Sequence, residues 1–464
     1  MAASRKILAV WGAVVYAVAL YFVGSLQAIE STANLYYAYF STITILVCFV
    51  VSAYVGVGVV SVLNLFLVSY GVFVFGRCFY IAAYFFISGD QLVSDDLYSL
   101  FWMAEHVVDA QGAFVLFSLT NSFILFVTIG YILAHESRSM DIGEFDLDKY
   151  FQKLMLFVFF LSAPFYFYDL VGVVLLTMNE GYLAKFSGQA DGVGKSSILK
   201  HFFYISLISL IVLSKSRTKY YFIFLLVPLL SILSGGRGGF VYPVLTFVYL
   251  FSRLNPDFKV SFLKVSIMLA FVFLCMSFLL RFSARGQAST DGFFDLLYFL
   301  YSQGITLGVI SFAILSELPY EWHTLAQSFV PAMSKVYAFF NPDTPGYMGS
   351  VTTFISYHAN PEMFIRGNGL GSSIVSELYL LSFGIFPLFL IGCFVLGFFF
   401  SWVESNSYRS WRFLVFLIVV LPLIINSPRN GFNVLFVSSI YVFMFLMFLI
   451  ALSRMRVKFS GVGY

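Results

Sequence analysis

Long apolar segments recur from one end of the chain to the other, and this repetition limits the chain to one class of fold. Each segment has about the 17–25 residues that an α-helix needs to cross the hydrocarbon core of a bilayer. A membrane β-barrel would show a weaker alternation of apolar and polar residues instead. The 464 residues are 60% hydrophobic and 11% charged, which leaves too few polar side chains for a water-soluble surface. We therefore predict an all-α, polytopic membrane protein.

The apolar segments predict about 12 transmembrane helices, within a range of about 11–13. They lie at residues 7–28, 34–55, 58–87, 111–133, 151–177, 200–214, 219–234, 239–253, 262–281, 380–403, 411–427 and 431–452. Residues 1–28 resemble a secretory signal, but their apolar run is longer than usual and further spans follow. We therefore interpret this stretch as the first transmembrane helix.

The charged residues between the spans predict the orientation of the chain. If the N-terminus is cytoplasmic, the basic residues fall in the cytoplasmic loops and tail: Arg138, Lys149, Lys215, Arg217, Lys219, Arg253, Lys259, Arg409, Arg454, Arg456 and Lys458. The second external loop is acidic: Asp90, Asp95, Asp96, Glu105 and Asp109. Because cytoplasmic loops are enriched in Lys and Arg, we expect both termini in the cytoplasm and an even number of spans.

Residues 293–316 are apolar enough to be mistaken for a further span. Counting them as one would invert everything downstream and place the basic tail outside, so we predict one or two helices that lie in the outer interface or re-enter from it. The chain then divides into helices at 1–281, one large external (periplasmic) loop region at 282–379, and helices plus a cytoplasmic tail at 380–464.

The external region differs in composition from the rest of the chain. It holds five prolines and a series of aromatic residues: Tyr320, Trp322, Tyr337, Phe339, Phe340, Tyr347 and Tyr357. Long loops in compact folds are usually functional. Aromatic rings beside amides and hydroxyls suit a sugar-binding surface, although membrane proteins also carry interfacial aromatic belts. Both interpretations stay open.

One stretch, Ser234-Gly235-Gly236-Arg237-Gly238-Gly239-Phe240, places a single guanidinium between two apolar runs. Its glycines allow backbone N–H groups to turn toward an anion. A plain tight turn whose arginine reaches to water is the alternative.

Five arginines fall at predicted external boundaries, where basic residues should be scarce: Arg237, Arg281, Arg285, Arg366 and Arg429. Because arginine pairs two phosphate oxygens at once, we predict a shared phosphate-bearing ligand, with scattered head-group anchors as the alternative.

Few residues of this region can act as a general base. His323 and His358 are the histidines of the external region, and Glu377 lies at the mouth of a span, where it could be a base or an arginine partner. A lone histidine is more often a hydrogen-bonded structural residue.

The four cysteines lie in apolar runs without a CxxC pair, so neither a disulfide framework nor a zinc site is expected.

Several features from Tyr220 to the C-terminus occur together in one known family. They are the Gly-Arg-Gly turn that opens a mid-chain helix, the large late loop, and the string Leu370-Gly371-Ser372-Ser373-Ile374-Val375-Ser376-Glu377-Leu378-Tyr379 followed by Phe383-Gly384. With the many spans, this pattern resembles the Wzy-type O-antigen polysaccharide polymerases (oligosaccharide repeat-unit polymerases) of Gram-negative bacteria.

The resemblance implies an integral membrane glycosyltransferase of the GT-C kind in the bacterial inner membrane. Such an enzyme transfers a growing glycan from undecaprenyl pyrophosphate to a hydroxyl of an incoming lipid-linked repeat unit, at the periplasmic face. In this scheme Arg237, Arg281 and Arg429, together with Arg285 and Arg366, form the pyrophosphate clamp, and His358 or His323 accepts the proton.

The resemblance implies neither a metal nor another cofactor. The implied partners are undecaprenyl-pyrophosphate-linked oligosaccharides and membrane lipids, with a chain-length regulator as a further candidate and no nucleic acid. Two alternatives stay open: an O-antigen ligase or other glycosyltransferase that uses lipid-linked sugars, and a flippase for the same lipid.

Overall fold

The computed structural model describes residues 2–27, 33–88, 97–99, 106–136, 149–180, 197–233, 237–255 and 292–460. Within these ranges every regular element is a helix. The chain separates into two compact units. Unit 1 comprises Met1–Ser137, Ser261–Trp402 and Ile425–Val437, and unit 2 comprises Arg138–Val260, Val403–Ile424 and Ser438–Tyr464.

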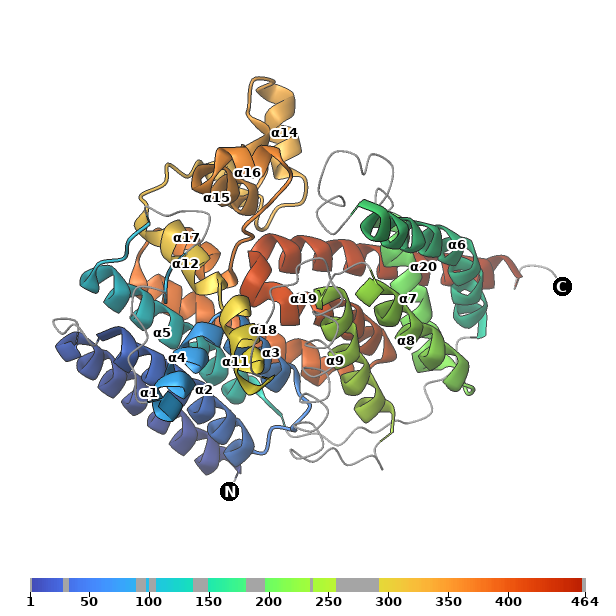
Figure 1. Ribbon diagram of the computed structural model, residues 1–464. Coiled ribbons are helices and arrows are strands. Elements are labelled where there is room, and N and C mark those ends of the chain that lie inside the picture. The colour runs from blue at the N-terminus through green and yellow to red at the C-terminus, as the bar shows by residue number, and fades with distance from the viewer. Residues whose placement is uncertain are drawn as a thin grey trace. The chain divides into compact units, whose positions relative to one another are not determined.

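The helices are numbered in chain order, as Figure 1 shows. Those within unit 1 are α1 (Ala2–Gln27), α2 (Ala33–Val55), α3 (Val62–Phe73), α4 (Gly76–Ser88), α5 (Ala110–Ala134), α11 (Gly292–Gln303), α12 (Thr306–Leu315), α13 (Trp322–Ala326), α14 (Met333–Phe340), η4 (Gly346–Gly349), α15 (Val351–Ala359), α16 (Pro361–Ile365), α17 (Ile374–Leu381) and the π-helical turn η5 (Asn433–Val437). Those within unit 2 are α6 (Lys149–Glu180), α7 (Ser197–Leu213), α8 (Thr218–Leu233), α9 (Arg237–Leu254) and α20 (Ser438–Ser460). Two helices, α18 (Phe386–Ser407) and α19 (Trp411–Phe432), contribute to both units.

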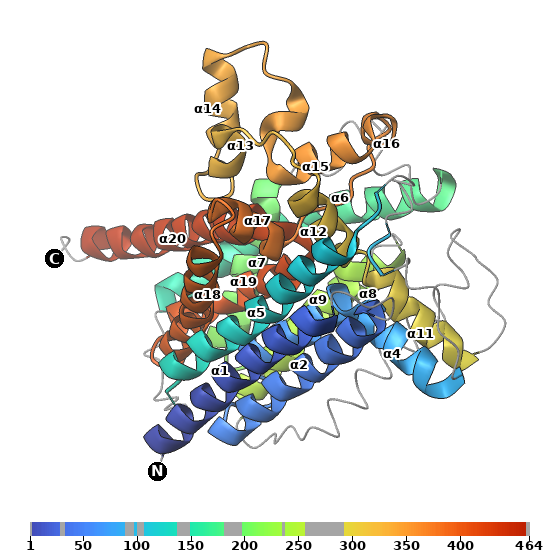
Figure 2. The same cartoon turned by 90° about the vertical axis from the view of Figure 1, so that its left-hand side faces the viewer.

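Unit 1 is built around α5, whose residues are mostly buried. Asp109 begins this helix by accepting a 2.7 Å hydrogen bond from the Gly112 N–H. Figure 2 shows α1, α2 and α5 side by side, and the buried Asn121 amide donates a 3.0 Å hydrogen bond from α5 to the Ser41 hydroxyl of α2. A Cβ at Gly397 of α18 would lie 1.9 Å from a carbonyl oxygen of α5, so these helices touch backbone to backbone. Small residues allow this close packing where no hydrophobic effect drives helices together.

Two helices of unit 1 are interrupted. The α3–α4 pair bends by 67° at residues 74–75, and α11 is separated from α12 at Gly304. The two breaks lie against each other, because a Cβ at Gly76 would sit 2.4 Å from the Leu300 carbonyl oxygen and one at Gly304 would sit 2.4 Å from the Arg77 nitrogen. Only glycine fits at both positions without moving a backbone.

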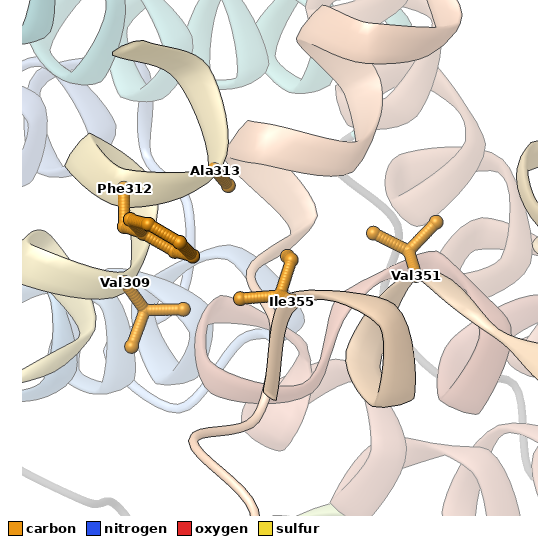
Figure 3. Close-up of a cluster of buried hydrophobic side chains, with 5 residues drawn as sticks. All are labelled: Val309, Phe312, Ala313, Val351 and Ile355. Carbon is orange, nitrogen blue, oxygen red and sulfur yellow. The ribbon is translucent and has the colours of Figure 1, made fainter. Parts of the chain in front are cut away.

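We call residues 317–381, which contain α13–α17, the late region. Its helices pack onto α12. Figure 3 shows Val309, Phe312 and Ala313 of α12 facing Val351 and Ile355 of α15 in one buried apolar cluster. Figures 1 and 2 show α14, α15 and α16 grouped at the end of unit 1 that lies away from α1 and α2. The position of this group is therefore set by α12 rather than by the surrounding loops.

Unit 2 contains a buried ion pair near the end of α9. The Arg253 guanidinium lies 3.4 Å from a Glu404 carboxylate oxygen, and both side chains are less than a tenth exposed. Arg253 also donates hydrogen bonds to the Tyr249 hydroxyl at 2.8 and 3.0 Å and lies 3.5 Å from the centre of the Tyr408 ring. These contacts satisfy both charges, as buried charges require.

The predicted spans agree with the observed helices. Eleven of the twelve coincide with a helix or with the bent α3–α4 pair, and the span predicted at 262–281 lies outside the described residues. By length and composition, the described residues hold seven helices able to cross a membrane, or up to eight if the bent pair counts as one span. The helices α7, α8 and α9 are shorter, and Trp411–Arg454 counts once although two spans were predicted there. The total of about twelve stays a prediction.

The stretch predicted to hold one or two interfacial helices forms two, α11 and α12. Its part Leu297–Leu315 is nevertheless long and apolar enough to cross a membrane, which the prediction did not allow for. The interfacial position of this pair, the periplasmic side of the late region and the three-part division of the chain stay predictions.

Candidate functional site

Three helix interruptions of unit 1 meet at Arg429. Gln303 is the last residue of α11, Phe73 is the last of α3, and Arg429 lies in α19 two residues before a non-helical residue, Gly431. The Arg429 Nη1 donates a 3.2 Å hydrogen bond to the Gln303 Oε1, and its guanidinium lies 5.6 Å from the centre of the Phe73 ring. Interrupted helices at membrane depth occur where the backbone is buried in protein or lines a polar cavity, and transporters use such breaks to bind ions and substrates.

The Arg429 side chain is exposed, and Gln303 accepts the one side-chain hydrogen bond that it makes to the described residues. A guanidinium carries five N–H donors. Most of its donors are therefore unused by the described part of the protein and can bind a ligand. Gln303 is a neutral acceptor, so it orients the arginine and leaves its charge uncompensated. A carboxylate in that place would compete with an anionic ligand.

The backbone around Arg429 is held by the buried carboxylate of Glu377 on α17. Glu377 Oε1 accepts a 2.7 Å hydrogen bond from the Ser372 hydroxyl, and Oε2 accepts bonds from the Ser328 hydroxyl at 3.0 Å and the Phe432 N–H at 2.8 Å. The backbone at Asn433 also donates to this carboxylate. We call Glu377, Ser328, Ser372 and these two backbone groups the Glu377 anchor.

Burial and hydrogen bonding act in opposite directions on Glu377. The side chain is 0% exposed, and this desolvation raises the pKa of its carboxyl above the usual value, while the donors of the anchor lower it. The burial effect is the larger one. With both oxygens engaged, the carboxylate has no free face for a substrate hydroxyl.

His323 lies in α13 and is 1% exposed. Its ring stacks on Tyr337, with ring centres 3.7 Å apart and planes 6° apart. The His323 Nδ1 lies 3.3 Å from the Glu321 Oε2, but neither ring nitrogen makes a hydrogen bond to the described residues. A carboxylate can orient a catalytic histidine through a hydrogen bond to Nδ1, but here the two groups are only neighbours and the ring is almost completely buried.

His358 lies at the end of α15 and is half-buried. Its Nδ1 lies 3.0 Å from the Phe354 carbonyl oxygen of the preceding turn, and its ring packs 4.1 Å from the Phe354 ring. If that nitrogen carries the proton, Nε2 is left as the acceptor. Both predicted histidines therefore lie in the group of helices that packs on α12, and the choice between them stays open.

The predicted gathering of five arginines is only partly visible. Arg281 and Arg285, and the side chain of Arg237, lie outside the described residues, and Arg237 belongs to unit 2. Arg366 follows α16, and its exposed side chain contacts no partner within the described ranges. The clamp formed by all five stays a prediction, and Arg429 is the member whose surroundings are described.

Sequence reasoning missed the partners of Arg429 and of Glu377. Gln303 is a lone amide followed by glycine inside an apolar run, and this combination signals a helix break with a polar side chain at it. Ser328 carries no such signal, because its role depends on a contact with a residue 49 positions later. Among the described residues, no group of three His, Cys, Asp or Glu side chains could hold a metal ion.

Comparison with known proteins decides the family. The family model described as O-antigen polysaccharide polymerase Wzy matches residues 12–458, nearly the whole chain. The chain belongs to this family. No curated protein and no solved structure matches it. The predicted resemblance is therefore confirmed, and it extends well beyond the part from Tyr220 onward on which it was based.

Membership of the Wzy family agrees with the fold. The apolar helices and the family together make the chain a multi-pass membrane protein of lipopolysaccharide biosynthesis. Polymerases of this family act on lipid-linked oligosaccharide repeat units, so the ligand expected at the site is an amphiphile with a polar head. A site made of helix breaks and aromatic residues suits such a ligand, because one part of it is apolar and the other is charged.

Proposed function

We propose that this Wzy-family chain polymerises undecaprenyl-pyrophosphate-linked repeat units and that Arg429 binds the pyrophosphate of the donor. The observation that carries the proposal is the exposed Arg429 guanidinium at three helix breaks, bonded to a neutral amide and to no carboxylate among the described residues. Phosphate groups pair well with the planar fork of arginine. The proposed site lies at the periplasmic face of the inner membrane, with both termini in the cytoplasm.

The reaction is a displacement at the anomeric carbon of the growing glycan. The bond from this carbon to the pyrophosphate oxygen breaks, and its electron pair leaves with undecaprenyl pyrophosphate. A new bond forms to a hydroxyl oxygen of the incoming repeat unit, whose proton passes to a base. Negative charge develops on the leaving oxygen, and a guanidinium already in place stabilises it without reorganisation.

His323 or His358 is the proposed base. His323 has a neighbouring carboxylate and an unused nitrogen, and the other histidine has an acceptor nitrogen when Nδ1 is protonated. General-base catalysis is typically worth about 10²–10⁴ in rate, so replacement of the true base should leave weak but measurable polymerisation. The exposed aromatic residues nearby, including Trp322 and Phe339, are the proposed contacts of the sugar rings.

The proposal is tested in cells that lack their own copy of this gene and express either Arg429→Ala or Arg412→Ala. Both arginines are exposed and lie on the same helix, but Arg412 is at its opposite end, beside Trp411. We expect lipopolysaccharide with a single repeat for Arg429→Ala and the normal ladder of chain lengths for Arg412→Ala. A normal ladder in both strains, with equal amounts of inserted protein, would remove Arg429 from the reaction.

The same gels separate a polymerase from both alternatives. Loss of a ligase would leave core lipid without any repeat unit, since that enzyme joins the glycan to the core. Loss of a flippase would leave repeat units on the cytoplasmic side, where they do not reach the core. A chain-length regulator is a further proposed partner, and its loss would change the length distribution without abolishing polymerisation.

A further inference from the structure

The Glu377 anchor joins segments that lie far apart in the chain. Ser328 follows α13, Ser372 precedes α17, and the two backbone donors follow the break in α19. The carboxylate thereby ties the late region to the end of α19 and the start of η5. Phe329 strengthens this connection, because its ring packs 5.4 Å from Phe432 and 5.7 Å from Phe436.

The anchor and Arg429 share one short piece of backbone. Gly431 has φ 68° and ψ −175°, and a Cβ there would lie 2.1 Å from the Glu377 Oε1. Gly371 has φ 87°, and a Cβ there would lie 3.2 Å from the Arg429 carbonyl oxygen. Segment 371–377 therefore contacts the main chain at Arg429 and again two residues later. A shift of this segment would therefore displace the main chain that carries Arg429.

Glu377 does not have the geometry of a base. A base must come within about 2.6–3.2 Å of the proton that it accepts. Both oxygens of Glu377 already accept hydrogen bonds from the protein, so a substrate hydroxyl would have to displace these donors. A carboxylate in this position fixes a backbone conformation instead, in the way that an acidic residue caps a helix N-terminus.

We propose that Glu377 is a positioning residue, which holds the break at Gly431 and so sets the place from which the Arg429 guanidinium reaches the lipid-linked substrate. The inference rests on the proposed function of Arg429. It assigns Glu377 to substrate binding through Arg429 and removes it from proton transfer. A displacement of about 1 Å at such a site can lower the rate by about 100-fold, so loss of the anchor should be visible in kinetics.

The test uses purified full-length protein in nanodiscs, with the lipid-linked repeat unit extracted from cells that lack this gene. KM and kcat are measured for Glu377→Gln, Ser372→Ala and Gly431→Ala. Gly431→Ala keeps the carboxylate but places a methyl group against it. We expect a higher KM for all three variants, by about tenfold for Glu377→Gln and Gly431→Ala and less for Ser372→Ala, which removes one donor.

Glu404→Gln is the matched control. Glu404 is also a buried, hydrogen-bonded carboxylate, but it lies in unit 2 with Arg253 and Tyr249. This variant should lose stability and keep its KM. An unchanged KM in Glu377→Gln and Ser372→Ala, or an equal change in Glu404→Gln, would overturn the positioning role. Ser372→Ala keeps the test decisive if the Glu377 variant fails to fold.

A double mutant separates this inference from the proposed function. If Glu377 acts through Arg429, adding Glu377→Gln to Arg429→Lys should change KM less than twofold, because the aligned guanidinium fork is already lost. A full tenfold change in that background would show that Glu377 acts independently. Wild-type KM and wild-type kcat in Arg429→Lys would instead contradict the proposed function, whatever Glu377 does.

Discussion

Among single residues, the side chain that accepts the Arg429 hydrogen bond determines the charge of the site. Gln303 accepts a hydrogen bond from the guanidinium without neutralising it, and its side chain is buried beside the break at Gly304. The basic character of the site is therefore available to an anion. This choice distinguishes it from the Arg253–Glu404 pair of unit 2, in which a carboxylate neutralises the arginine.

We expect the charge at position 303 to decide substrate affinity. Gln303→Leu removes one hydrogen bond of Arg429 and should raise KM for the lipid-linked repeat by about tenfold to about a hundredfold, since hydrogen bonds to charged groups contribute about 1.5–3 kcal/mol. Gln303→Glu offers Arg429 a competing carboxylate and should be worse. Steady-state kinetics of both variants check this order. If Gln303→Glu binds substrate better than Gln303→Leu, the ligand at Arg429 is not anionic.

The acidity of Glu377 gives a second prediction at this scale. Because burial raises the folded pKa above the value near 4.3 of an unfolded chain, the folded protein binds the proton more tightly. The unfolding free energy contributed by this group therefore rises as pH falls through the folded pKa, and the gain is complete below the unfolded pKa. The difference in thermal midpoint between wild type and Glu377→Gln should shift in favour of wild type on acidification. A shift in the opposite direction would mean that the donors outweigh burial.

Among the helices and turns, some features could be predicted from the sequence and others could not. The apolar runs predicted the helices because hydrophobicity over a span is a local property. The boundary predicted between the spans at 411–427 and 431–452 falls at residues 428–430, but these residues stay helical and the non-helical residue is Gly431. The contact of Arg429 with Gln303, 126 positions away, could not be predicted, because it depends on how two broken helices meet. Glu377 was identified, but its anchoring contacts depend on tertiary structure.

The close contact of α4 with α11 should not tolerate a methyl group. Gly304→Ala would place a Cβ 2.4 Å from the backbone nitrogen of Arg77, which forces the two breaks apart. Overpacking of this kind typically costs about 1–3 kcal/mol, so the thermal midpoint should fall by several degrees and polymerisation should weaken. Gly12→Ala is the control, because a Cβ there meets nothing within 4 Å. Equal stability of the two variants would contradict the observed contact.

For the whole molecule, orientation in the membrane determines the side on which the site lies. The distribution of basic residues predicts that the late region faces the periplasm and that both termini are cytoplasmic. The helices identify the chain as a multi-pass membrane protein, but the side on which each loop lies is not contained in helix length or composition. The apolar stretch Leu297–Leu315 makes the matter concrete, since a crossing there would change the side of everything that follows.

Cysteine labelling of the full-length protein measures orientation directly. A cysteine in place of Asp343, which is exposed in the late region, should react with a membrane-impermeant maleimide in spheroplasts. A cysteine in place of Arg456 should react only after the membrane is permeabilised. Native Cys48, Cys78 and Cys393 are buried and should add little background, and the fourth cysteine, Cys275, is replaced by serine in both variants. Labelling of both positions from the outside would show that the number of spans between them is even, which contradicts the predicted orientation.

If the Arg429 guanidinium binds a diphosphate, the affinity of the purified protein for undecaprenyl pyrophosphate measures this interaction directly. Purified wild-type protein and Arg429→Lys are titrated with undecaprenyl pyrophosphate and with undecaprenyl phosphate. We predict that wild type prefers the pyrophosphate and that Arg429→Lys weakens its binding by about tenfold or more, which corresponds to about 1.4 kcal/mol. Equal affinity of the two proteins for undecaprenyl pyrophosphate would contradict the claim.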